Sequence, residues 1–253
     1  YPDQKFPYME RLLNKLNKNI TIDFWDSFWV YNPNLVNKAA SYCQKISCAN
    51  NFVAEHFNFI PRPKPIFPIG VNLKNYIQKQ DYNLSDPITF IYTGLPNNVE
   101  TFLSIISLTL KELYKTVNLK LILITRHREN ITDFPVEFHN FDESTFYKHL
   151  ASADIGLYAI EDSEISRGKM AMKILDYMAA ALPIVASPYG LTPHAVNNEN
   201  IIIVEEPEEW LEKIQLLIKD IDLRKKIGYN AWISMIQNHE ISQSYKLFKK
   251  IIF

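Results

Sequence analysis

Cysteine is scarce in this sequence, which has only Cys43 and Cys48 among 253 residues. No histidine or acidic cluster lies near them at the spacing of metal ligands, so neither a metal site nor a disulfide framework is expected. We interpret Cys43 as a buried helix residue and Cys48 as a strand residue of a reduced protein. This interpretation favours a cytoplasmic setting.

Excess charge of either sign and long hydrophobic runs are also missing. The 27 Lys and Arg residues against 28 Asp and Glu leave a net charge of −1, which gives no general attraction to nucleic acid or to acidic membranes. We expect neither a signal peptide nor a membrane-spanning helix, because no apolar run is long enough. With 47% hydrophobic and 22% charged residues, the composition predicts a globular protein of one large or two smaller domains.

Short apolar runs alternate with helical patterns along the chain. Runs at 20–24, 45–48, 88–92, 119–125, 136–138, 155–158, 184–186 and 201–204 predict strands, and the clearest later helices span 99–115, 144–151 and 168–181. Such alternation is typical of an α/β protein with a doubly wound parallel sheet. In the first 60 residues Asn32 and Asn50 are the expected helix caps, and the pattern indicates the later part of an α/β domain.

Prolines mark the boundary between two parts of the chain. Pro61, Pro63, Pro65 and Pro68 fix an extended segment that cannot continue a helix. We therefore predict an incomplete α/β domain over 1–70 and a doubly wound, Rossmann-like domain over 71–237. Residues 238–253 are predicted to form a final helix.

The candidate site lies in the loops that follow the predicted strands, because ligands bind outside the carboxyl ends of parallel strands. These loops contain residues 93–98, 126–128, 161–169 and 187–194. Three of only six glycines, Gly94, Gly168 and Gly190, fall there and would permit close approach to a phosphate. Each glycine alone is equally compatible with a tight turn.

The helix predicted over 168–181, which Pro183 would terminate, carries an unusual charge pattern. Lys169, Lys173 and Asp176 share one face, and two lysines near a helix start oppose the macrodipole and repel each other. An anionic ligand would relieve both effects, and a solvated surface face is the alternative. The aromatic residues, 13% of the chain, are scattered through apolar segments and are interpreted as core.

Three consecutive motifs give the sequence a resemblance to a known family. Residues 153–157 read ADIGL, residues 173–179 read KILDYMA, and residues 182–190 read LPIVASPYG. In composition and order they resemble the C-terminal donor-binding domain of the group 1 glycosyltransferases of family 4. The resemblance implies the two-domain GT-B fold and a retaining transfer of a hexose from a nucleotide-diphosphate sugar, without a metal or other cofactor. It also implies that the 238–253 helix returns to the N-terminal domain, and that roughly the first hundred residues of the usual enzyme are absent.

The resemblance assigns the site residues position by position. Lys173 matches a helix lysine that contacts the departing diphosphate, and Asp176 takes the position of a glutamate that bonds the nucleotide ribose. Gly168 stands where another glutamate usually contacts the donor sugar, so that contact is either missing or supplied by Glu161, Asp162 or Glu164. The candidate catalytic residues are Lys173, Arg126, Lys169 and Asp26, and the candidate donor-binding residues are Gly94, Glu164, Arg167, Gly168, Asp176, Ser187, Gly190 and His194. Arg126 as a surface charge and Asp26 as a cap of its loop are the alternatives.

The expected partners are a nucleotide sugar and a glycan, lipid-linked or other acceptor, and not nucleic acid. The basic final helix, with Lys246, Lys249 and Lys250, could touch the anionic inner face of a membrane or dock on the N-terminal domain. The sequence does not indicate an oligomeric state. The alternative function is that of a shortened, non-catalytic glycosyltransferase-like module that binds a nucleotide or a partner protein.

Overall fold

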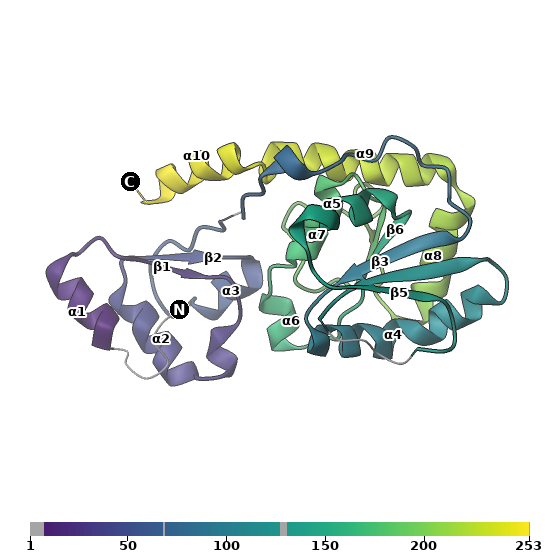
Figure 1. Ribbon diagram of the computed structural model, residues 1–253. Helices are drawn as coiled ribbons and strands as arrows, with labels where there is room; N and C mark the ends of the chain where they lie inside the picture. The colour runs from purple at the N-terminus through teal and green to yellow at the C-terminus, as the bar shows by residue number, and fades with distance from the viewer. Residues whose placement is uncertain (1–7, 68, 127–130, 253) are drawn as a thin grey trace.

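The computed structural model describes residues 8–67, 69–126 and 131–252 (Figure 1). A parallel two-stranded sheet pairs β1 (Thr21–Phe24) with β2 (Lys45–Cys48). A parallel six-stranded sheet follows, with the strand order β5-β4-β3-β6-β7-β8. Its members are β3 (Ile88–Thr93), β4 (Leu119–Ile124), β5 (Val136–His139), β6 (Ile155–Tyr158), β7 (Ile184–Ala186) and β8 (Ile202–Ile203). This arrangement confirms the predicted doubly wound α/β fold.

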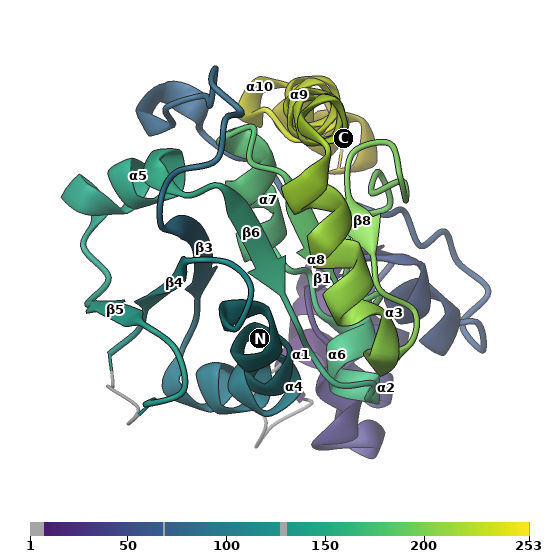
Figure 2. The ribbon, with the colours of Figure 1, turned by 90° about the vertical axis from the view of Figure 1, so that its right-hand side faces the viewer.

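Helices cover both faces of the six-stranded sheet (Figure 2). One core cluster joins the sheet to α5 (Glu143–Ser152), α7 (Met172–Ala179) and α9 (Ile221–Asn238). The other joins its opposite face to α4 (Pro96–Tyr114) and α8 (Trp210–Lys219). Because both faces are buried, the central strands are nearly continuous apolar runs, as in the ITFIYT sequence of β3.

The N-terminal part has a core of its own. It consists of α1 (Tyr8–Leu16), the 3-10 turn η1 (Phe28–Val30), α2 (Pro33–Tyr42) and α3 (Asn51–His56) around β1 and β2. Phe24 and Phe57 stack in this core with ring centroids 4.6 Å apart. The predicted caps are confirmed, since the side chains of Asn32 and Asn50 accept backbone hydrogen bonds in the first turns of α2 and α3.

The two cysteines lie inside this N-terminal core as separate thiols. Cys43 directly follows α2 and Cys48 ends β2, and both are buried and free. Burial raises the pKa of Cys43 to about 11 and that of Cys48 to about 12. Both therefore remain protonated, unreactive thiols at neutral pH.

The predicted single helix over 168–181 is wrong. The chain instead forms α6 (Glu164–Gly168) within the segment predicted as a polar loop, then an extended Lys169, and α7 begins only at Met172. Tertiary partners replace the helical hydrogen bonds at the break: Asn50 donates to the carbonyls of Arg167 and Lys169, and the N–H of Ala171 donates to the carbonyl of Gly190. The far end also differs from the prediction, because α7 ends at Ala179, before Pro183.

The N-terminal part packs directly against α6 (Figure 1). The Ser27 hydroxyl donates to the carbonyl of Glu164 at 2.6 Å, and Asn50 holds the two carbonyls around Gly168 at 3.0 and 3.1 Å. A Cβ on Gly168 would lie 1.6 Å from Ser27 Oγ, so only glycine permits this approach. These contacts fix the turn that carries Lys169 against the loop after β1.

The connecting segment between the two sheets pairs with the C-terminal end of the chain. It contains the 3-10 turn η2 (Leu73–Asn75), and the last helix is α10 (Ile241–Ile252). Val71 bridges to Glu240, and the ring of Phe248 in α10 lies 5.7 Å from that of Phe67. Among the described residues, no helix is both long and apolar enough to cross a membrane.

Candidate functional site

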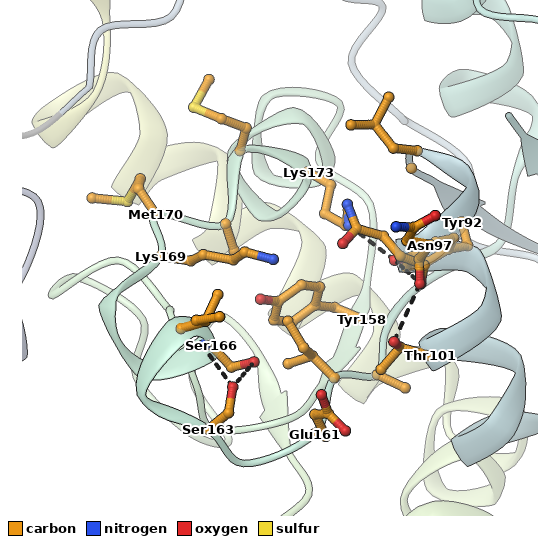
Figure 3. A pocket seen from close by; sticks show the side chains of 18 of the residues that line it. Tyr92, Asn97, Thr101, Tyr158, Glu161, Ser163, Ser166, Lys169, Met170 and Lys173 are labelled. Carbon is orange, nitrogen blue, oxygen red and sulfur yellow. Dashed lines mark hydrogen bonds between the residues drawn. The ribbon is translucent and has the colours of Figure 1, made fainter. Parts of the chain in front are cut away.

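A cleft of about 480 Å³ opens where several elements of the fold meet (Figure 3). It lies at the carboxyl ends of β3 and β6, beside the N-terminus of α4 and the turn between α6 and α7. Asp26, which follows β1, lines it from the N-terminal part. Of the predicted site residues, the structure brings Asp26, Gly94, Lys169 and Lys173 together around this cleft, and of the three acidic candidates for the donor-sugar contact only Glu161 lines it.

Lys173 extends from the first turn of α7 into the cleft and is held by two tyrosines. Its Nζ donates to the Tyr92 hydroxyl at 3.0 Å, and that hydroxyl donates to the carbonyl of Asn98 in α4 at 3.0 Å. The same Nζ lies 4.4 Å from the ring centroid of Tyr92 and 5.4 Å from that of Tyr158. Cation–π contact and one neutral hydrogen bond only partly replace the water that a lysine loses on burial.

The electrostatics of Lys173 favour an anion. Its pKa is lowered from the usual 10.5 to about 8, mainly by burial and in addition by the nearby Lys169, while Asp176 opposes the shift. A lysine with this pKa is still mostly charged at pH 7, but its charge is undercompensated. A bound anion would supply the missing compensation.

Lys169 reaches the cleft from the turn between α6 and α7, where its own carbonyl is held by Asn50. Lys169 and Lys173 both line this cleft, but they reach it from a turn and a helix and not from the single helix face that was predicted; a shared anionic ligand stays a prediction. Asp26 faces the same space, and burial raises its pKa while Lys169 lowers it. The cleft thus combines two cations with one carboxyl group from the N-terminal part.

The N-terminal turn of α4 forms the remaining wall. Its N-cap residue Leu95 makes no side-chain capping bond, and Asn97, Asn98 and Thr101 line the cleft with Gly94. The dipole of this 19-residue helix adds partial positive charge at that wall. The sequence predicted residues 94–98 as part of a ligand-facing loop, but it did not point to Thr101. The only signal for Thr101 was its position about one turn into the helix that follows this loop.

Asp176 lies outside the cleft lining. Its carboxylate accepts a hydrogen bond of 2.5 Å from the hydroxyl of Tyr76, which directly follows η2. Burial raises the pKa of Asp176 to about 6, while the Tyr76 hydrogen bond and Lys173 oppose that rise. The assignment of Asp176 to a ribose contact therefore stays a prediction, with Tyr76 now occupying one of its oxygens.

Three other predicted residues, at α6 and after β4, are exposed and do not line the cleft. The Arg167 guanidinium is exposed and pairs with Asp162 through two hydrogen bonds of 2.6 Å. Glu164 is exposed, and its carbonyl is taken by Ser27. Arg126 is exposed two residues after β4 and directly precedes residues 127–130, so the rest of the predicted 126–128 loop lies outside the described residues.

The predicted residues after β7 do not line the cleft. Gly190 supports the turn that carries Lys169, and Ser187 and His194 line other hollows. Gly190, at φ +67°, positions the carbonyl that holds the Ala171 N–H. Ser187 accepts a hydrogen bond from the N–H of Ile160 and borders a separate hollow of about 450 Å³ that contains Tyr189 and Trp210. His194 borders a different hollow beside α9. Within the described residues, no group of three or more His, Cys, Asp or Glu residues is arranged to hold a metal ion.

Residues 87–220, just over half of the chain, match the family described as Glycosyl transferases group 1. The chain belongs to the group 1 glycosyltransferases. The matched segment begins just before β3 and ends after α8, so it contains most of the residues that line the cleft. No curated protein sequence matches this glycosyltransferase directly.

Solved structures similar to this glycosyltransferase share its fold. Anabaena HepE in complex with UDP and glucose is 13% identical, with a TM-score of 0.75 over 98% of this chain and 75% of HepE. Sucrose-phosphate synthase from Thermosynechococcus elongatus is 12% identical, with a TM-score of 0.71 over 96% of this chain and 71% of the synthase. S. aureus TarM is 12% identical, with a TM-score of 0.66 over 87% of this chain but only 46% of TarM. Identities this low establish the fold alone, and the fold of this glycosyltransferase is GT-B.

Proposed function

We propose that this chain is a retaining hexosyltransferase of family 4 that uses a nucleotide-diphosphate sugar as donor. The observation that carries the proposal is the convergence of Lys173 and Lys169 on a cleft at the carboxyl ends of β3 and β6. Membership in the group 1 glycosyltransferases supports a donor of this kind, and so does the fold shared with HepE, which was solved in complex with UDP and glucose. The acceptor is a glycan, a lipid-linked compound or another hydroxyl compound; a glycan acceptor is in line with the alpha-GlcNAc-glycerol bound in the TarM complex.

The proposed chemistry needs positive charge more than a protein nucleophile. When the bond between the sugar and the diphosphate breaks, negative charge develops on the leaving phosphate. A new bond forms between the sugar and the acceptor oxygen, whose proton passes to an oxygen of the leaving diphosphate. A cation already fixed in the cleft stabilises that charge without reorganising. Lys173 serves this role because Tyr92 fixes its Nζ and burial leaves its charge undercompensated. Lys169 supplies the second cation.

The division of labour in the proposal follows the two parts of the chain. Residues 71–237 bind the donor, residues 1–70 contribute the acceptor side through Asp26, and residues 238–253 return toward the N-terminal part. The direct packing of Ser27 and Asn50 against α6 supports such a shared cleft. No metal or other cofactor has a role in this mechanism.

One feature favours a second candidate function, a nucleotide-binding module without turnover. Asp176, the expected ribose contact, lies outside the cleft and is bonded to Tyr76. Such a module would bind a nucleoside diphosphate without releasing it from a nucleotide sugar. A transferase binds the nucleotide and also releases it from the nucleotide sugar. An assay of nucleotide release from the sugar donor therefore distinguishes the two functions.

The proposal is tested by calorimetric titration of UDP, GDP and ADP into the wild type and Lys173→Met. Lys225→Met is the matched control, because Lys225 is exposed on α9 and outside the cleft. We expect one nucleotide to bind, the Lys173 variant to lose roughly tenfold to hundredfold in affinity, and the control to match the wild type. Equal binding by wild type and Lys173→Met, or binding of none of the three nucleotides, would contradict the proposal.

A further inference from the structure

The hydroxyl of Tyr158 is the one polar group of the cleft that burial leaves without a partner among the described residues. Tyr158 ends β6 and is only 2% exposed. Neighbouring buried tyrosines differ: Tyr92 bonds Lys173 and Asn98, and Tyr177 bonds the carbonyls of Ile91 and Leu157. A buried hydroxyl without a hydrogen bond is costly, and phenylalanine would fill the same space without that cost. The lone hydroxyl therefore points to a ligand.

The position of Tyr158 indicates what that ligand carries. Figure 3 shows its phenol beside Lys169 and Lys173, with the hydroxyl toward the Lys169 amine and Glu161 apart from both lysines. The Lys173 Nζ lies 5.4 Å from the Tyr158 ring centroid. Two cations close to one buried phenol favour an acceptor atom with negative charge.

The ionisation of Tyr158 is consistent with a donor role. Burial, and to a smaller extent Asp26, raise the pKa of this phenol well above its usual value. It therefore keeps its proton over the whole neutral range. A phenol in this state donates one hydrogen bond and adds no charge of its own.

We propose that the Tyr158 hydroxyl donates a hydrogen bond to a phosphoryl oxygen that lies between Lys169 and Lys173. This inference rests on the proposed function and adds a residue to it: Tyr158 binds the diphosphate of the nucleotide-sugar donor directly. The lysines neutralise the phosphate charge, and Tyr158 fixes the orientation of one oxygen. The aromatic residue at the end of β6 is thus a binding group as well as a part of the core.

The test is the Tyr158→Phe substitution, which removes one oxygen atom and keeps the ring. Tyr82→Phe is the matched control, since the Tyr82 hydroxyl is also buried but donates to the carbonyl of Ala181 outside the cleft. Binding of inorganic pyrophosphate and of UDP, GDP and ADP is measured by calorimetry for the wild type and both variants. Thermal unfolding without ligand is measured in parallel.

We expect Tyr158→Phe to lose roughly tenfold to hundredfold in affinity for pyrophosphate and for the preferred nucleotide. Its unfolding temperature without ligand stays equal to or rises above that of the wild type, because the variant loses only an unpaired hydroxyl. Tyr82→Phe shows the opposite result, a lower unfolding temperature with unchanged binding. A purely structural role for Tyr158 cannot produce this separation of binding from stability.

The outcomes separate this inference from the proposed function. If Tyr158→Phe binds both ligands as the wild type does, the Tyr158 inference is overturned, while a loss of binding in Lys173→Met still supports the donor site. If only pyrophosphate binds and depends on Tyr158, the inference stands and the nucleotide donor is refuted. If the wild type binds neither pyrophosphate nor any of the nucleotides, both proposals are overturned.

Discussion

Replacing Lys173 with methionine should stabilise the free protein while it weakens ligand binding. Burial lowers the pKa of Lys173 from 10.5 to about 8, and this difference corresponds to about 3 kcal/mol as an upper limit. Methionine has a similar length and needs no hydration. At pH 7 the free energy of unfolding should therefore rise by as much as about 3 kcal/mol in Lys173→Met.

The pH dependence of this gain is the sharper part of the prediction. The unfolded chain keeps the Lys173 proton up to about pH 10.5, whereas the folded protein releases it near pH 8. The unfolded state thus binds more protons between these values, so the wild type gains stability as the pH rises through this range. Lys173→Met lacks this group, and its advantage over the wild type should shrink steadily above pH 8.

Urea unfolding followed by tryptophan fluorescence at pH 7 and pH 9.5 measures both effects. The exposed-site variant Lys225→Met should differ little from the wild type at either pH, since it removes a hydrated charge. A Lys173→Met variant that is less stable than the wild type at pH 7 would refute the reasoning. A stability gain that does not change between the two pH values would refute it as well, because the charge of Lys173 would then already be compensated in the free protein.

Three further predictions concern buried contacts outside the cleft lining. Gly168→Ala places a Cβ 1.6 Å from Ser27 Oγ and should lower the unfolding free energy by about 1–3 kcal/mol in urea titrations; an unchanged midpoint would contradict the packing role of this glycine. His239 is fully buried, and burial lowers its pKa from 6.5 to about 4. The unfolding free energy of the wild type should therefore fall by up to about 3 kcal/mol as the pH falls from 6.5 to 4. In His239→Gln the unfolding free energy should change less over the same pH range. Tyr76→Phe removes the hydroxyl that bonds Asp176 and should cost about 1–3 kcal/mol at pH 7.5 but less at pH 5, where the carboxyl is protonated; an equal loss at both values would contradict this pairing.

The strands were largely predictable because their signal is local. The runs at 45–48, 155–158 and 184–186 have the same bounds as β2, β6 and β7, since apolar residues buried on both faces need no information from elsewhere. The break between α6 and α7 was not predictable, because it depends on Asn50 and Gly190. The two hydrogen bonds from Asn50 join residues more than a hundred positions apart, and the bond from Ala171 reaches past α7 and β7 to Gly190, so a local pattern cannot reveal them.

The site residues also divide into those that a local motif revealed and those that depend on contacts between distant parts of the chain. Lys173 was identified from its motif, and the structure places it in the cleft; Lys169 is there too, although the helix face that suggested it does not exist. Gly168 was expected to face a phosphate, but its close neighbour is Ser27, a contact that only the packing of the N-terminal part creates. Tyr92 and Tyr158 were interpreted as core residues, and they are buried. Their additional contact with Lys173 depends on the meeting of β3, β6 and α7 and has no signature in the sequence.

The most direct test of the donor site is a crystal structure of the protein with the nucleoside diphosphate that binds it most tightly. We predict that the phosphates lie in the cleft, with oxygens about 3 Å from Lys173 Nζ and from the Tyr158 hydroxyl. A nucleotide whose phosphates lie instead in the hollow between Ser187 and Trp210, away from both lysines, would contradict the account.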